Sequence, residues 1–286
     1  IDVINTFYET QLHRQEQNYD LLNDSDIQNA NVELIGSLAY SCSTNLANQF
    51  DDVVSLLIEL LQFQTQNYLN GNINDLLLVH SLFNCLGMFV TNMTSLMSQY
   101  VDTLLPIIIE FFKSVIETEE SNEEKQKYAT PEMIIDKQIY FSDHFSAPAI
   151  DFLEKVLESM PEKIQNEVMI VDYITVSIHS LNSISKKEIL SSISLLVQFF
   201  KFLAILNKSQ DSTDYLEIVK MFIKLIYDKL NEEIENIITN DDNKILFSWM
   251  ECIKVIYISF KADVFIIEEE GQERFIIFDI FNSLID

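Results

Sequence analysis

The amino-acid sequence predicts an all-α protein: an α-solenoid of antiparallel helix pairs, each stacked against the next. Two observations predict this class. Apolar residues recur at i, i+3, i+4 and i+7 along almost the whole chain, and no segment sustains the alternation of a half-buried strand. One pattern also occurs twice, and repeats of a few tens of residues are typical of stacked helix pairs.

The repeat aligns residues 34–61 with residues 85–112 without a gap, at an offset of 51. The two copies share two glycines, two aspartates and two glutamates: Gly36 and Gly87, Asp51 and Asp102, Glu59 and Glu110. We expect the glycine to let a neighbouring backbone approach and the aspartate to cap the second helix of each pair. Two unrelated amphipathic helices would share the apolar spacing, but periodicity does not demand the shared glycine and aspartate.

The apolar spacing places the helices in order along the chain. They are expected at 2–22, 26–47, 51–69, 74–92, 99–118, 146–160, 162–182, 186–207, 212–238, 242–261 and 272–285. Asp51 and Asp102 suit helix N-termini, and Pro131 and Pro148 suit a first turn, where the missing N–H is harmless. Residues 194–206 weakly resemble residues 106–117, which indicates further pairs, about five in all.

Residues 117–145 interrupt the series. They are polar and acidic, with a short apolar stretch around residues 133–135. Long connections are often functional or disordered, so we expect a partly mobile insertion with a short helix at 131–138. We expect residues 1–286 otherwise to form one continuous segment of a longer protein.

Charge and composition exclude several classes of function. The chain carries 45 acidic and 18 basic residues, a net charge of −27, and residues 1–112 contain Arg14 as their single base. Such a chain repels phosphate backbones, so we expect no direct nucleic-acid partner and favour basic protein segments. Only 4 glycines occur, and they form no phosphate-binding loop.

Cysteine usage and hydropathy point to an intracellular, non-membrane protein. Cys42, Cys85 and Cys252 are widely spaced, and the chain begins without a signal-peptide pattern. The longest uncharged run, residues 76–101, contains several polar side chains, so we expect no membrane insertion.

The search for catalytic motifs predicts no enzyme, no cofactor and no metal. The pair Asp51-Asp52 resembles the start of a terpene-synthase metal box, but the third carboxylate and the second box are missing. The histidines are far apart and form no ligand spacing: His13, His80, His144 and His179. An all-α enzyme stays as a remote alternative.

Two runs of acids are the candidate partner-binding residues. The first comprises Glu117, Glu119, Glu120, Glu123 and Glu124, and the second comprises Glu268, Glu269, Glu270 and Glu273, between the last two expected helices. Such clusters attract lysine-rich and arginine-rich segments, although many charge runs serve only solubility. Aromatic residues near helix ends are expected mainly in packing, with a smaller chance of lining grooves: Tyr8, Tyr19, Phe50, Phe63, Tyr68 and Tyr100.

The helix pair with an aspartate near the start of its second helix resembles HEAT repeats. The segment YVDTLLPIIIEFF at residues 100–112 looks like second helices of importin-β-type nuclear transport receptors, the karyopherins. Many HEAT repeats carry a basic residue after that aspartate, whereas Leu57 and Ile108 stand at those positions here. The resemblance therefore points to a divergent HEAT-like chain.

This resemblance implies a protein-binding segment of a receptor that shuttles between nucleus and cytoplasm. Its implied partners are basic or extended cargo segments, the GTPase Ran in its GTP form, and phenylalanine-glycine nucleoporins. The alternative is a HEAT-repeat scaffold of another complex, such as a phosphatase-regulatory, chromosome-associated or vesicle-coat subunit.

Overall fold

The computed structural model describes most of the chain: residues 25–41, 47–70, 76–121, 131–164, 166–209, 214–239, 243–269 and 272–276. These residues are helical except for turns and one short two-stranded sheet, so the all-α class is confirmed. The chain forms two compact units, Ile1–Ser191 and Ser192–Asp286. The single continuous segment of a longer protein stays a prediction.

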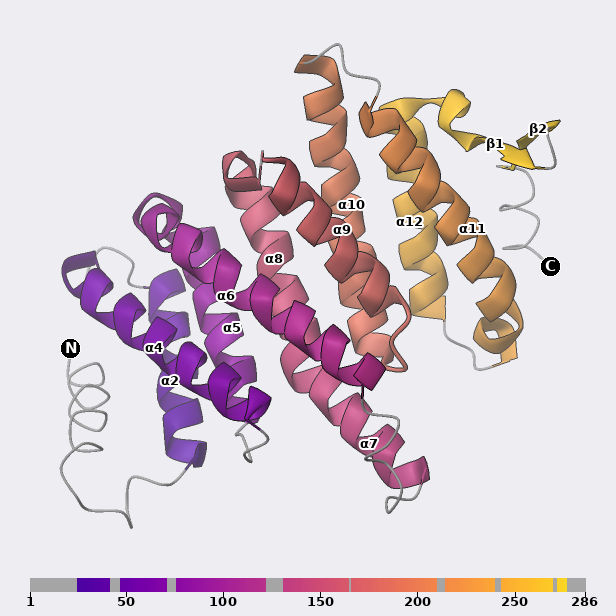
Figure 1. The fold of residues 1–286 in the computed structure, drawn as a ribbon. Helices are drawn as coiled ribbons and strands as arrows, with labels where there is room; N and C mark the ends of the chain where they lie inside the picture. The colour runs from indigo at the N-terminus through magenta and orange to yellow at the C-terminus, as the bar shows by residue number, and fades with distance from the viewer. Residues whose placement is uncertain are drawn as a thin grey trace. The chain divides into compact units, whose positions relative to one another are not determined.

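The first unit contains seven of the described α-helices and the start of an eighth. They are α2 (Ser25–Ser41), α4 (Phe50–Leu69), α5 (Leu76–Asn92), α6 (Thr94–Ser121), α7 (Pro131–Phe141), α8 (Ala147–Ser159), α9 (Glu167–Leu181) and the first turns of α10 (Lys186–Ser209). Within this unit α5 lies between α2 and α8, and α6 lies between α4 and α9 (Figure 1). The helices therefore form two layers, and the chain alternates between them.

Helix α5 lies at the centre of the first unit and contacts α2, α4, α6 and α8. Apolar side chains are buried on several of its sides, among them Leu78, Leu82, Phe83 and Phe89. This central place explains why the longest uncharged run of the sequence begins here, because a helix covered on several sides has little exposed surface for charges. Helix α4 instead buries an apolar stripe along one side and exposes its opposite side to solvent.

Short helical turns lie between some of the described helices of this unit: the 3-10 turns Ala47–Gln49 and Pro161–Ile164, and the π-helical turn Ser142–Ser146. The π turn connects α7 to α8 without a break and buries Phe145, whose ring stacks on Phe141 at 5.3 Å between centroids. Of the interval 117–145, residues 117–121 continue α6 and 131–145 are helical, and 122–130 lie outside the described residues.

The second unit contains the rest of α10, then α11 (Asp214–Thr239) and α12 (Asn243–Phe260). Phe199 and Phe200 of α10 both contact the ring of Phe222 in α11. Residues 186–207 are long and apolar enough to cross a membrane, but 67% of their most apolar window is buried, which fits a core helix equally well.

The chain of the second unit continues through the 3-10 turn Ala262–Phe265 into the strands β1 (Ile266–Glu269) and β2 (Gln272–Phe275). The expected helix at 272–285 is therefore wrong at its start, and its later residues lie outside the described part. The antiparallel register places Ile266 opposite Phe275, and the Ile276 N–H donates to the Phe265 carbonyl at 3.0 Å. Contacts of β1 with α11 hold the hairpin against a helix, a tertiary effect that local sequence does not report.

The other described helices lie close to the predicted ranges. Helix α6 begins at Thr94 rather than at residue 99, and α2 ends at Ser41 rather than at 47. The expected helix at 2–22 lies outside the described residues. Among the described residues each unit buries one free cysteine, Cys85 in α5 and Cys252 in α12, and burial raises the pKa of both thiols.

Candidate functional site

The two repeat glycines both face the next helix of their layer. A Cβ atom at Gly36 of α2 would lie 3.1 Å from the Cys85 Cα atom of α5. A Cβ atom at Gly87 of α5 would lie 2.9 Å from Nζ of Lys155, on α8. The prediction of close backbone approach is confirmed at Gly36, whereas Gly87 makes room for a long side chain.

The aspartates of the repeat connect one helix pair to the next. Oδ1 of Asp51 accepts hydrogen bonds from the Tyr100 hydroxyl at 2.7 Å and from Nε2 of Gln99 at 3.2 Å, both on α6. Helix α4 begins at Phe50, and its N-cap residue, Gln49, makes no capping hydrogen bond with its side chain. The predicted cap at Asp51 is wrong, although a carboxylate in the first turn still favours the helix dipole.

Asp102 lies well inside α6 because that helix begins earlier than its counterpart in the first copy. The backbone breaks only at Met93, whose carbonyl accepts from the N–H of Met97 at 2.9 Å, while the Thr94 hydroxyl donates to the Val90 carbonyl at 2.8 Å. The predicted cap at Asp102 is therefore also wrong. Its carboxylate instead accepts from Nζ of Lys163 at 2.7 Å, immediately before α9.

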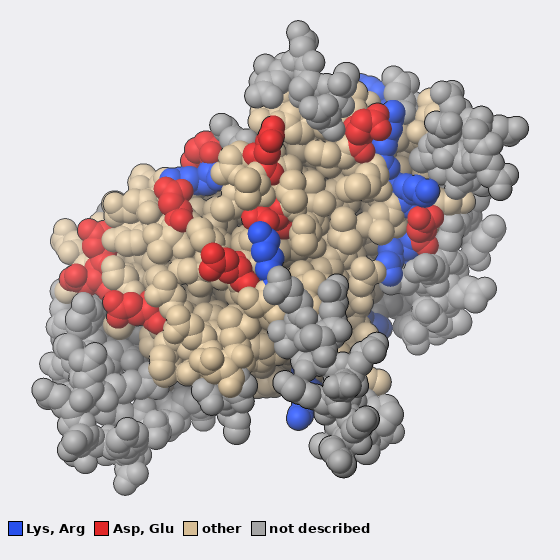
Figure 2. Space-filling model, in the orientation of Figure 1, with Lys and Arg blue, Asp and Glu red and all other residues tan. Residues whose placement is uncertain are grey.

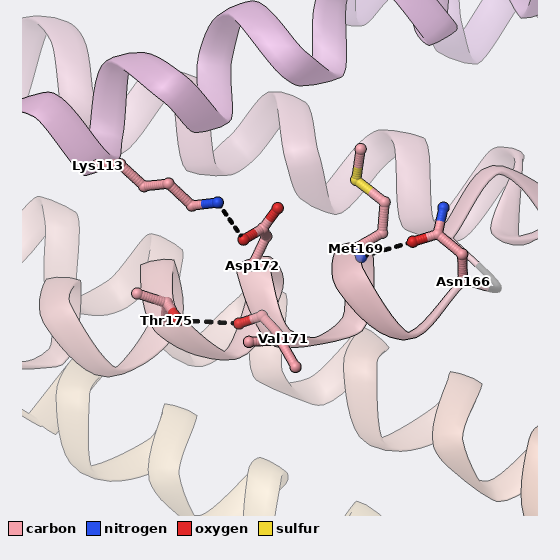
Figure 3. A network of polar contacts seen from close by, with 6 residues as sticks. All are labelled: Lys113, Asn166, Met169, Val171, Asp172 and Thr175. Atoms are coloured by element: carbon pink, nitrogen blue, oxygen red, sulfur yellow. Dashed lines mark hydrogen bonds and ion pairs between the residues drawn. The ribbon is translucent and has the colours of Figure 1, made fainter.

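A further ion pair joins α6 to α9 (Figure 3). Nζ of Lys113 lies 2.6 Å from Oδ1 of Asp172, whose side chain is 9% exposed. Asn166 caps α9 by accepting from the Met169 N–H at 2.7 Å. Acid-to-donor contacts of this kind thus connect α4 to α6 and α6 to the α9 region.

The remaining acids of the repeat face solvent. Asp52 and Glu59 of α4 and Glu110 of α6 are exposed, and none forms an ion pair within the described part of the chain. Residues 25–112 contain no lysine or arginine. Figure 2 shows acidic side chains over α4 and α6, with uncharged surface between them. We call Asp52, Glu59 and Glu110 the acidic face.

The structure describes the two predicted acid runs only in part. Glu117, Glu119 and Glu120 lie in the last turns of α6, while Glu123, Glu124 and Glu270 lie outside the described residues. The second run lies not in a loop between helices but in the hairpin, where the register places Glu268 directly opposite Glu273 and Glu269 opposite Gln272.

The described aromatic residues mostly pack between helices, as expected. Phe50 is buried against Phe89 and Tyr100, and Tyr68 contacts Phe111 and Phe141. Phe63 differs, because it is 55% exposed on α4. Tyr8 and Tyr19 lie outside the described residues.

Two histidines that the sequence keeps far apart meet beside the π turn. The rings of His80 on α5 and His144 lie 5.6 Å apart, and both Nδ1 atoms are buried without a hydrogen-bond partner. Burial, reinforced by the charge of Lys187, lowers the pKa of both imidazoles. Among the described residues no group of three or more potential ligands gathers around a point that could hold a metal ion.

The π turn explains how Lys187 is held there. Such a turn departs from the α-helical hydrogen-bond ladder and changes which carbonyls are available. The Asp143 carbonyl accepts from Nζ of Lys187 at 2.9 Å, and the Asp143 carboxylate accepts from the Ser185 hydroxyl. No sequence motif indicates this arrangement.

Comparisons with known proteins add no family. No protein-family model, curated protein or solved structure matches the chain.

Proposed function

We propose that the chain is a protein-binding scaffold whose helix pairs stack as a HEAT-like α-solenoid. The alternation of α2, α5 and α8 with α4, α6 and α9 supports this proposal, as do the repeat glycines, which face the next helix of their layer. A single pair cannot bury its apolar face alone, so each pair depends on its neighbours.

The partner we propose is a basic or extended protein segment bound at the acidic face. The observation that carries this proposal is the exposure of Asp52, Glu59 and Glu110 within residues 25–112, which contain no lysine or arginine. Lys113, one turn after Glu110 on α6, is paired with Asp172. Unpaired carboxylates on one surface attract cations at long range and raise association rates, and salt weakens the effect.

Binding of a fluorescent lysine-rich peptide to the full chain tests this surface. Replacing the three acids by their amides should weaken binding about tenfold at low salt, if each loses roughly 0.5 kcal/mol of screened attraction. The matched control replaces Glu158, Glu162 and Glu167, which are exposed acids of the same unit, and changes the net charge equally. An equal loss of peptide affinity in both triple variants would show that only net charge matters. It would reject the acidic face as the binding site.

Among protein-binding scaffolds, we propose a function in nuclear transport, which the resemblance to importins and exportins suggests. Its partners would include the GTPase Ran and phenylalanine-glycine nucleoporins, and the protein would act in the nucleus and the cytoplasm. Capture of the protein by immobilised Ran-GTP or by phenylalanine-glycine repeats tests it. Failure in both assays would exclude transport and leave the scaffold proposal to be judged by the peptide experiment.

A further inference from the structure

A cavity of about 350 Å³ lies in the first unit, between the end of α4, the second half of α6, α7, the π turn and the connection from α9 to α10. This volume is at the lower end of the range for small-molecule sites, roughly 300–1,000 Å³. The apolar part of its wall is formed by Tyr68, Phe112, Val115, Phe141 and Ile184. The rings of Tyr68 and Phe141 stack at 4.8 Å between centroids, so an aromatic pair forms part of this wall.

The polar part of the wall contains a buried carboxylate. Glu188, in the first turn of α10, lines the cavity although it is only 3% exposed. Burial raises the pKa of its carboxyl, and the Ser183 hydroxyl, which donates to Oε2 at 2.7 Å, opposes that rise. The ion pairs formed by lysine and arginine within the described residues do not include Glu188.

Neighbouring hydrogen bonds fix the position of this carboxylate. The Ser183 hydroxyl also accepts from the Ser185 N–H at 3.1 Å, and the Ser185 hydroxyl accepts from the Glu188 N–H at 3.2 Å. Ser185 thus caps α10 while Ser183 orients the Glu188 side chain. A carboxylate held in this way needs no rearrangement to receive a ligand, which reduces the entropy lost on binding.

The chemistry of the wall indicates the kind of ligand. Three hydroxyls line the cavity with Glu188, those of Ser142, Ser146 and Ser183. A primary ammonium has three donors and no acceptor, so it can satisfy the carboxylate and hydroxyl oxygens together. Lys137 and His179 also line the cavity. The Lys137 side chain is exposed to solvent, whereas the charge of His179 acts on Glu188 and lowers the pKa of its carboxyl.

We infer that this cavity binds a lysine side chain of a protein partner, with the ammonium at Glu188 and the aliphatic stem along Tyr68, Phe112 and Phe141. The assignment rests on the proposed function in one respect, since that function supplies a lysine-bearing partner. The cavity and the acidic face are different sites, because none of the acidic-face residues lines the cavity.

Saturation-transfer NMR on the full chain tests the cavity with a blocked lysine, N-acetyl-lysine methylamide. Its uncharged counterpart, N-acetyl-norleucine methylamide, keeps most of the stem and lacks the ammonium. We expect the lysine probe to bind at least tenfold more tightly, as a charge-assisted hydrogen bond to a buried carboxylate requires. Equal binding of the two probes would overturn the assignment.

Two variants locate the binding. Glu188→Gln keeps the shape of the side chain and an acceptor for Ser183, and should weaken the lysine probe at least tenfold. Ile184→Trp fills the mouth from an exposed loop position and should reduce binding similarly without disturbing the core. The control Glu162→Gln should leave the probe's affinity unchanged. Retained affinity in both Glu188→Gln and Ile184→Trp would overturn the proposal.

The two binding proposals fail separately. If the acidic-face variants lose the lysine-rich peptide while the blocked lysine does not bind, only the cavity assignment is wrong. If the blocked lysine binds through Glu188 while the acidic-face variants bind the peptide normally, only the acidic face is wrong.

Discussion

Gly36 and Gly87 occupy equivalent positions in the repeat but meet different kinds of neighbour. A methyl group at position 36 would press on the backbone of Cys85, which cannot move without shifting α5. A methyl group at position 87 would meet the flexible end of Lys155. The same substitution should therefore have different effects at the two sites.

We expect Gly36→Ala to destabilise the fold by about 1–3 kcal/mol, the usual cost of overpacking. We expect Gly87→Ala to be neutral, or to stabilise the fold by up to about 1 kcal/mol, because Lys155 moves aside and alanine favours helix. Urea unfolding of each full-length variant, followed by circular dichroism, measures the difference. Equal destabilisation at both positions would contradict the distinction.

Glu188 should make stability depend on pH in a definite direction. Because burial raises the pKa of Glu188 in the folded chain above its ordinary value of 4.5, the folded state holds this proton more tightly than the unfolded state. Stability from this group is therefore greatest at low pH and falls as pH rises from about 4.5 through the raised pKa of the folded state.

Unfolding free energies from pH 5 to 8 test the expectation. Relative to Glu188→Gln, the wild-type protein should lose stability as the pH rises through the raised pKa of Glu188 and then level off. An exposed substitution, Glu162→Gln, serves as the control and should show no such trend relative to wild type. A wild-type stability that rises relative to Glu188→Gln would reverse the assigned sign.

At the scale of elements, the Lys113–Asp172 ion pair should stabilise the contact between α6 and α9. The Asp172 side chain is 9% exposed, so removing Lys113 leaves a nearly buried charge without its partner. A double-mutant cycle with Lys113→Met and Asp172→Asn should give a coupling above about 1 kcal/mol. The exposed pair Lys254–Glu251 should give about 0.3–0.5 kcal/mol. A Lys113–Asp172 coupling as small as this control would contradict the expectation.

Helices whose apolar residues recur with the helical period could be predicted from the sequence. The ranges expected for α4, α5, α8 and α12 agree with the structure to within two residues at each end. The start of α6 could not be predicted in this way, because the break after α5 is confined to Met93 and depends on a hydrogen bond from Thr94 to the preceding helix. The periodicity of apolar residues indicates which face of a helix is buried. It does not indicate where the backbone hydrogen bonds of the helix are interrupted.

The hairpin could not be predicted from the sequence for a different reason. Glu268, Glu269 and Glu273 have low strand propensity, and the short segment offers apolar residues that fit a helix equally well. Contact of β1 with α11 decides in favour of strands. Propensity is a weak guide where tertiary packing supplies the free energy.

Candidate site residues were harder to predict than helices. The repeat identified Asp51 and Asp102 as special, but a local cap was the expected role and a contact with the next pair is the observed one. Glu188 carried no motif, and the cavity that it lines is formed by residues of α7 and α9 as well as by α10 itself. Contacts between residues so far apart in the sequence depend on how the helices are arranged. The sequence pattern does not determine that arrangement.

For the whole molecule, the stacked-pair proposal predicts an extended particle. A compact chain of this length has a radius of gyration of about 19 Å by the scaling rule. Small-angle scattering of the full chain should give a clearly larger value. A value near about 19 Å would exclude the solenoid.

The two buried cysteines give each unit its own chemical reporter. Cys85 belongs to the first unit and Cys252 to the second, and a buried thiol with a raised pKa does not react as a thiolate. With Cys42 replaced by serine, a thiol reagent would label position 85 only when the first unit opens and position 252 only when the second opens. The order of labelling would then show which half of the chain loosens first, and whether a bound partner closes one half or both.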